Sequence, residues 1–229
     1  MINLENYEVF GWEHAIRGMR NPMNSWDRSD SAYCIECRAC HTCPMLDEYG
    51  QCNKPFNEAY VVGENDHDLM TRLAKGGPVH AKYRRMITVY VDINAPLYWW
   101  KEFDTYKVGT VANSCSTMHK IHAKEFTMDD FSCEHLDAGN HLIFNNVIVN
   151  ALNEARNNFL RNGDKADWWQ MIQLLPSSYN QKRTVMLNYE VLHNIYISRK
   201  NHKLDEWRTF CDWIEKLPYR EIITVKESE

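Results

Sequence analysis

The spacing of hydrophobic residues along the chain predicts a series of helices and a few strands. Apolar residues recur every three or four positions over residues 137–161, which predicts a long amphipathic helix; its buried face holds Leu142, Ile143, Val147, Ile148, Ala151, Leu152, Ala155 and Phe159. The β-branched run 86–93 predicts a buried strand. Further blocks predict helices over 13–19, 63–75, 97–103, 167–175 and 204–217, and short strands over 8–12 and 221–225.

The stretch 174–207 combines helical spacing with polar residues. Leu175-Pro176 stops one helix, and a second helix is predicted from the apolar residues Met186, Leu187, Val191, Leu192 and Ile195. Asn188 and Asn194 lie among these residues, and Arg199 closes the last turn. A buried amide needs partners, which a flat aromatic ligand rich in donors and acceptors could supply. Taken singly, each of the three is better explained as a helix-surface or capping residue.

The order of these elements predicts an α+β fold, with a mixed or antiparallel sheet flanked by helices and a helix-rich C-terminal half. A chain of 229 residues can bury one sizeable core, so we expect a single domain over 1–229. Residues 31–60 differ in character, because they are polar, rich in turn residues and hold five of the eight cysteines. We interpret them as a Cys-rich loop inserted into the main fold.

Composition narrows the classes of protein. A net charge of −5 argues against a protein that coats nucleic acid. No apolar run approaches the roughly 18–20 residues that span a bilayer, and the N-terminal residues lack the pattern of a signal peptide. The simplest expectation is a cytoplasmic protein whose cysteines are reduced unless they bind metal.

Cysteines recur at every third position in the inserted loop, where they form CxxCxxCxxC, and a fifth follows nine residues later. The five are Cys34, Cys37, Cys40, Cys43 and Cys52. Four thiolates can converge on one soft metal ion, and we rank structural zinc first. A reduced surface loop ranks second. An iron–sulfur cluster ranks third, since the run is one residue short of the ferredoxin pattern.

The polar residues of the 174–207 stretch resemble a signature of the flavin-dependent thymidylate synthases. That family has a Leu-Pro pair, an asparagine twelve residues after the proline, a second asparagine six further on and an arginine five beyond that. The chain matches these offsets without a gap, at Leu175-Pro176, Asn188, Asn194 and Arg199. The family's next-helix tryptophan corresponds to Trp207, one residue late. The resemblance covers most of the chain except residues 31–60.

The family's phosphate- and flavin-binding motifs are only partly matched. Its Arg-His-Arg motif corresponds to Thr105, Tyr106 and Lys107, and the glutamine before it to Glu102. In the Ser-rich loop that follows, Thr110 is a chemically similar replacement. Two further arginines of the family are replaced here by Ile172 and Glu190.

These losses imply a rearranged site. A phosphate needs several charge-assisted donors, which threonine and isoleucine cannot provide. Arg199 remains, and Lys107, Lys120, Lys182 and Arg183 are candidates for an anion site, although each lysine taken singly is better explained as solvated surface charge. Tyr106 could stack on a flavin or base. His80 lies near the place of a family histidine at the substrate–flavin interface.

The resemblance implies reductive methylation of dUMP, with methylenetetrahydrofolate supplying the carbon, NADPH the electrons and FAD the hydride. Asn188 and Asn194 would hydrogen-bond the flavin, assisted by His80 and residues 105–107. Arg199 would hold and polarise the nucleotide, with Glu102, Thr110 and Lys182 as further substrate contacts. The family's active site lies between the subunits of a homotetramer. Two alternatives are a relative that adds a different one-carbon group to a pyrimidine nucleotide, and a non-catalytic nucleotide- or flavin-binding protein.

Overall fold

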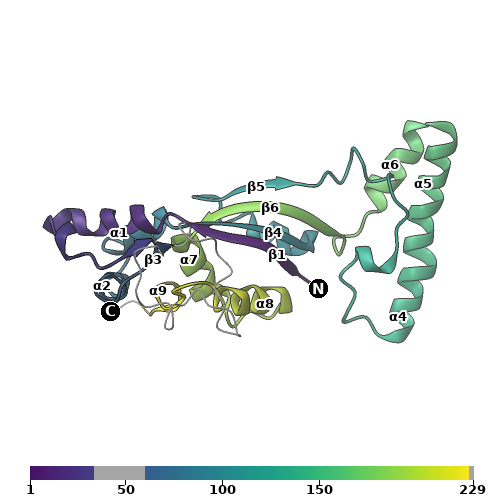
Figure 1. The fold of residues 1–229 in the computed structure, drawn as a ribbon. Coiled ribbons are helices and arrows are strands. Elements are labelled where there is room, and N and C mark those ends of the chain that lie inside the picture. Colours follow the sequence, from purple (N-terminus) through teal and green to yellow (C-terminus); the bar gives the residue numbers. More distant parts are fainter. Residues whose placement is uncertain (34–59, 227–229) are drawn as a thin grey trace. The chain divides into compact units, whose positions relative to one another are not determined.

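A computed structural model describes residues 1–33 and 60–226, and divides the chain into two compact units (Figure 1). The first unit comprises Met1–Asn6, Val91–Lys107 and Val111–Val185. The second comprises Tyr7–Tyr90, Val108–Thr110 and Met186–Glu229. The predicted Cys-rich insertion, with its five cysteines, lies outside the described residues.

A four-stranded antiparallel sheet has the order β1-β4-β6-β5. Its strands are β1 (Asn3–Phe10), β4 (Thr88–Pro96), β5 (Val111–Ser114) and β6 (Asn180–Asn188). Buried and less buried residues alternate along β4 and β6, as expected for strands with one face on the core. The α+β fold with an antiparallel sheet is therefore confirmed. A smaller pair, β2 (Ala32–Tyr33) and β3 (Tyr60–Val61), is also antiparallel.

The first unit buries two groups of apolar side chains: the aromatic residues of helix α3 (Leu97–Phe103), and a cluster that includes Leu152 and Met171. Helix α3 buries Trp99, Trp100 and Phe103, and the Trp100 indole N–H donates to the carbonyl of Gln181 at 2.9 Å. The long helix predicted over 137–161 is present as α4 (Ala138–Ile143), a π-helical segment η6 (Phe144–Val149) and α5 (Asn150–Asn162). Helix α6 (Lys165–Leu174) packs beside α5. The predicted buried face of the long helix is partly wrong, because Leu142, Ile143 and Val147 are exposed.

The second unit is mainly helical. It contains α1 (Trp12–Arg20), α2 (Glu64–Lys75), the 3-10 segment η4 (Ala81–Met86), α7 (Tyr189–Arg199), α8 (Asp205–Ile214) and α9 (Glu221–Thr224). The Trp12 ring meets those of Tyr189 and Tyr219 edge-on, at centroid distances of 5.3 and 4.9 Å. Shorter 3-10 turns are η1 (Asn21–Met23) and η2 (Trp26–Arg28) here, and η5 (Met128–Asp130) in the first unit.

Two further sequence predictions of local structure are wrong. The helix expected from Met186 begins only at Tyr189, because residues 180–188 form a strand in which Gln181, Val185 and Leu187 are buried alternately. The strand expected over 221–225 is the short helix α9, which buries Ile222 and Ile223. None of the described helices is both long and apolar enough to cross a bilayer.

Candidate functional site

Asn188 occupies the junction between β6 and α7 and caps the helix. Its backbone is extended, and its side-chain Oδ1 accepts hydrogen bonds from the backbone N–H groups of Glu190 (3.1 Å) and Val191 (3.0 Å). These are two of the N–H groups that a helix start leaves without partners. Within the described residues, nothing accepts a hydrogen bond from the Asn188 Nδ2 group. The amide therefore holds the helix with its oxygen and keeps its donor available.

The loop 108–110 lies against this amide. Gly109 has a φ of +81°, and a Cβ on it would lie 2.7 Å from the Asn188 Nδ2 atom. Only glycine adopts this backbone easily and leaves room for the amide. The next residue, Thr110, has a buried hydroxyl without a hydrogen-bond partner among the described residues. The predicted site residue Asn188 thus packs against Gly109, which is the chain neighbour of a second predicted site residue, Thr110.

Arg199 lies at the other end of α7. Its guanidinium carbon is 4.9 Å from the ring centre of Trp207, which is fully buried, so the arginine is held by a cation–π contact. Eleven residues of helix separate Arg199 from Asn188, or about 16 Å along the axis. Asn194, between them, is exposed. The structure therefore does not gather the three residues at one point, and a ligand that touches both ends of α7 must be extended.

Glu190, at a position where the resemblance expects an arginine, forms a buried ion pair. Its Oε2 lies 3.4 Å from Nη1 of Arg84, and both side chains are buried. Arg84 also donates to the carbonyl of Ala74 at 3.2 Å. A buried guanidinium needs a carboxylate and hydrogen-bond acceptors, so Glu190 has a structural role here.

Lys182, predicted to contact an anionic substrate, is paired with acids of the first unit. Its ammonium lies 2.6 Å from Glu5 and 3.3 Å from Asp92. The hydrogen bonds to Glu5 and then to Asp92 raise the pKa of Lys182. Asp92 also accepts from Thr184 at 2.6 Å, which is the main reason that its own pKa is lowered. The positive charge of Lys182 is therefore already matched by two carboxylates.

The other predicted residues of the first unit lie together after α3. Thr105 donates its hydroxyl to the carbonyl of Glu102 at 2.7 Å and closes a turn. Thr105 and Lys107 are exposed, whereas Tyr106 is half-buried. They form a short surface turn with two hydroxyls, one aromatic ring and one ammonium.

His80 belongs to the second unit, where it precedes η4 and is exposed. It lines a cleft of about 960 Å³ together with Met19, Arg28, Leu69 and Lys82. None of the other predicted site residues lines this cleft. His80 is therefore the one predicted flavin contact among the residues that line this cleft, where its neighbours are both charged and apolar.

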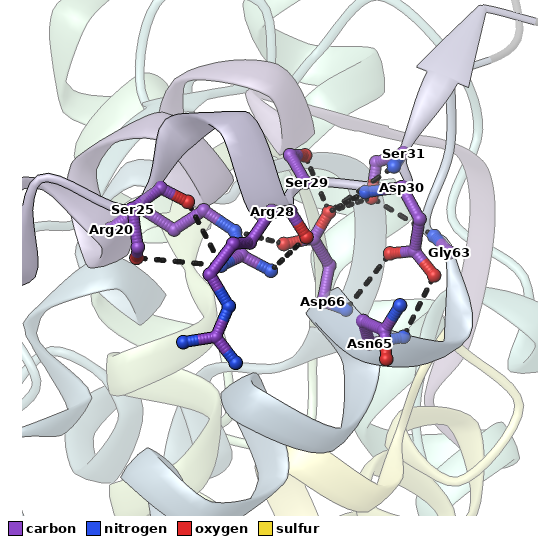
Figure 2. A network of polar contacts seen from close by, with 9 residues as sticks. All are labelled: Arg20, Ser25, Arg28, Ser29, Asp30, Ser31, Gly63, Asn65 and Asp66. Carbon is purple, nitrogen blue, oxygen red and sulfur yellow. Dashed lines mark hydrogen bonds and ion pairs between the residues drawn. The ribbon is translucent and has the colours of Figure 1, made fainter.

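A buried ion pair in the second unit escaped the sequence interpretation (Figure 2). The Arg20 Nε atom donates to Asp66 Oδ1 at 2.6 Å, and both side chains are almost fully buried. The other carboxylate oxygen accepts from the hydroxyls of Ser29 and Ser31, both at 2.6 Å, and from the backbone N–H of Asp30. Because all its polar atoms are occupied, this network holds structure rather than a ligand. In the sequence, Asp66 is only one of the acidic residues in the first turn of a predicted helix, and this gave no indication of the buried ion pair.

Among the described residues, no group of three or more His, Cys, Asp or Glu side chains could hold a metal ion. Cys34, Cys37, Cys40, Cys43 and Cys52 are not among those residues, so the zinc site stays a prediction.

Solved structures with the same fold include flavin-dependent thymidylate synthases. The chain aligns with ThyX from Helicobacter pylori complexed with FAD and dUMP at a TM-score of 0.62 and 15% identity, over 97% of each chain. A second ThyX structure from that organism, with FAD and dUMP, gives 0.64 and 14%, over 96% and 94% of the two chains. The UMP/dUMP methylase PolB from Streptomyces cacaoi, bound with 5-Br dUMP, gives 0.56 and 11%, over 97% and 94%.

Comparison by sequence gives nothing further, because no protein-family profile and no curated protein matches the chain. The resemblance expected from the 174–207 stretch is confirmed at the level of the fold. At 11–15% identity these likenesses show the fold alone.

Proposed function

We propose that this chain is a flavin-dependent enzyme that transfers a one-carbon group to a pyrimidine nucleotide of the dUMP class. The proposal is supported by the fold, by the match at Asn188, Asn194 and Arg199, and above all by one observation. At the start of α7, the Asn188 amide donor and the buried Thr110 hydroxyl have no partners among the described residues. Buried polar atoms are normally paired, so the Thr110 hydroxyl supports a ligand at this loop, and the Asn188 donor is available beside Gly109.

The residues at the start of α7 fit the edge of a flavin ring. That edge carries carbonyl acceptors and a ring N–H, which suit an amide donor and a hydroxyl that can donate or accept. Gly109 leaves the space beside Asn188 free of a side chain. Asn188 would orient the ring, Thr110 would satisfy a second polar atom, and Arg199, fixed by Trp207, would hold an anionic group of the nucleotide. FAD, when bound, supplies the hydride chemistry.

In the full proposal the reaction is the reductive methylation of dUMP, with methylenetetrahydrofolate and NADPH as co-substrates. Asn194, His80, Thr105, Tyr106 and Lys107 remain candidate flavin contacts. Glu102 remains a candidate nucleotide contact.

A second candidate is a relative with changed chemistry, which adds a different one-carbon group to a pyrimidine nucleotide. Two observations favour it: Lys182 is already paired with Glu5 and Asp92, and Glu190 stands where the resemblance expects an arginine. Fewer cations are then left for a phosphate. Incubation of dUMP, UMP and dCMP with FAD, NADPH and methylenetetrahydrofolate, followed by mass analysis, separates these candidates. If every nucleotide is recovered unmodified, the hypothesis that remains is a non-catalytic binding protein.

The sharpest test of the flavin site is Asn188→Asp. Aspartate keeps the oxygen that caps α7 but replaces the amide donor by a second, charged acceptor. We expect at least a tenfold weaker affinity for FAD, corresponding to about 1.4 kcal/mol or more, with an unchanged melting temperature. FAD binding is followed by quenching of flavin fluorescence.

Asn157→Asp, on the exposed surface of α5, makes the same change at a residue that is not among the proposed flavin contacts and should bind FAD like the wild type. Equal affinity of Asn188→Asp and wild type would refute the proposed flavin contact. Failure of the wild-type protein to bind FAD at all would refute the flavin proposal itself.

We also propose structural zinc at the Cys-rich stretch. Protein purified without chelator should contain about one zinc ion per chain, as expected for four thiolate ligands. Elemental analysis measures the zinc, and Cys37→Ser together with Cys40→Ser should abolish it. Iron in place of zinc, with absorbance in the visible range, would indicate a cluster instead. If the wild-type protein contains neither zinc nor iron, the remaining interpretation is a reduced loop without metal.

A further inference from the structure

The cleft of about 960 Å³ in the second unit is lined by residues of α1, α2, η4 and the segment 22–30. Its volume is in the range of small-molecule sites. Apolar side chains of different elements line it and remain accessible: Met23 is 82% exposed and Val79 is 69% exposed, while Leu69 and Leu73 of α2 are half-buried. The apolar part of a ligand can therefore be covered from several elements at once.

The segment 25–30 forms a wall of this cleft, and its backbone is fixed from behind (Figure 2). The buried guanidinium of Arg20 donates to the backbone carbonyl of Arg28 at 3.0 Å. The carboxylate of Asp30 accepts from the backbone N–H of Asn65 at 2.9 Å, which ties the segment to the start of α2. A ligand that binds at this wall meets a backbone that is already ordered, so little conformational entropy is lost on binding.

The side chain of Arg28 takes no part in that network. In Figure 2 its guanidinium lies apart from the other residues drawn. Neither this guanidinium nor the ammonium of Lys82 on η4 has a hydrogen bond or ion pair with any residue in the described part of the chain. Both side chains are exposed and line the cleft. Two positive charges are thus available to a ligand there.

The acids that line the cleft do not cancel these charges. Asp30 is engaged with the start of α2, and Asp68 pairs with Arg72 at 3.1 Å. Of the lining acids, only Asp27 has a carboxylate without a partner among residues 1–33 and 60–226. The two available cations therefore outnumber the one available carboxylate, and the cleft favours an anion.

We propose that this cleft is a second ligand site, which binds an anion carried on an apolar body, such as a carboxylate or sulfonate attached to an aromatic ring. Arg28 and Lys82 hold the anionic group by charge-assisted hydrogen bonds, and Met23 and Val79 pack against the apolar body. Arg28 and Lys82 are not among the proposed flavin or nucleotide contacts. The inference therefore goes beyond the proposed function and does not depend on it.

The test uses anilinonaphthalene sulfonate, an aromatic sulfonate whose fluorescence rises in apolar surroundings. The native wild-type protein should bind this probe saturably, at about one molecule per chain. Arg28→Gln combined with Lys82→Gln, which we call the cleft variant, should bind it at least about tenfold more weakly, because both charged donors are lost. Val79→Ser should weaken binding by about threefold, because it removes an apolar contact.

Arg17→Gln combined with Lys75→Gln is the matched control. It makes the same change in net charge on α1 and α2, at exposed positions that do not line the cleft, and should bind the probe like the wild type. Because every substituted side chain is exposed, the melting temperatures should be unchanged. Weaker binding then reports lost contacts with the probe and not unfolding.

Competition tests what the cleft selects. Naphthalene sulfonate should displace the probe, whereas inorganic sulfate at the same concentration should not, because it has no apolar body. The proposal would be overturned by a wild type without saturable binding, by equal affinities of the cleft variant and the control, or by displacement with sulfate. Displacement by FAD would also overturn it, since the cleft would then belong to the proposed flavin site. A wild-type protein that binds the probe but not FAD would contradict the proposed function alone.

Discussion

Replacing Asp66 by asparagine is expected to lower the free energy of unfolding by about 3–5 kcal/mol, because it leaves the buried guanidinium of Arg20 without a counter-charge. The new amide also turns a donor toward groups that can only donate, namely the backbone N–H groups of Asp30 and Ser31 or the guanidinium. Both effects act at a side chain that is fully buried. Urea denaturation followed by tryptophan fluorescence measures the loss.

Asp68→Asn is the matched control for this prediction. It makes the same chemical change two residues along the same helix, in an exposed ion pair with Arg72 at 3.1 Å. Exposed ion pairs at this spacing contribute little to stability, so we expect the free energy of unfolding to change by no more than about 0.5 kcal/mol. If Asp66→Asn cost no more than Asp68→Asn, the buried network would contribute nothing beyond a surface pair.

The contribution of Asp66 should also depend on pH. Burial by itself raises the pKa of this carboxyl, but the hydrogen bonds from Ser29, Ser31 and Arg20 outweigh that effect, and the net pKa is lowered. A carboxyl whose pKa is lower in the folded state stabilises fully above its unfolded pKa of about 3.9. The stabilisation is lost as the pH falls through the folded pKa. The difference between wild type and Asp66→Asn should therefore shrink below about pH 4.

The sequence predicts the helices of this fold better than its strands. Helices α1, α2 and α3 and the long helix through residue 162 follow from local signals, namely apolar spacing and turn residues at their ends. Strand β6 was missed because Met186 and Leu187 also fit the helical spacing of the residues that follow. Its hydrogen bonds to β4 join positions about a hundred residues apart, and no local pattern reports them.

The candidate site was predictable in its residue types but not in its geometry. Asn188 was expected either to face a ligand from the side of a helix or to be a surface or capping residue; it is the cap, and this position leaves its Nδ2 group available. The pairing of Glu190 with Arg84 joins residues 106 positions apart. In the sequence, Asp66 follows the Cys-rich stretch, whereas its partners Arg20, Ser29 and Ser31 precede it. Such contacts depend on tertiary structure, so charge and spacing along the chain could not reveal them.

The second large effect is expected at Gly11, which links β1 to α1. Its φ is +95°, and a Cβ there would lie 2.1 Å from the carbonyl oxygen of Met86, a backbone atom that no side-chain rotation can move away. For Gly11→Ala we add about 1–2 kcal/mol for the left-handed backbone and about 1–3 kcal/mol for the steric conflict. The expected loss of stability is thus about 2–5 kcal/mol.

Gly163→Ala separates these two contributions. Gly163 ends α5 with a φ of +68°, and a Cβ there would meet no atom within 4 Å. It should therefore show the backbone cost alone, about 1–2 kcal/mol, while the effect of alanine on the unfolded chain is the same for both variants and cancels. Chemical denaturation of the two proteins gives the difference directly. A loss at Gly11 equal to that at Gly163 would mean that the Met86 carbonyl yields freely, and that the start of α1 is not held against the segment leading into β4.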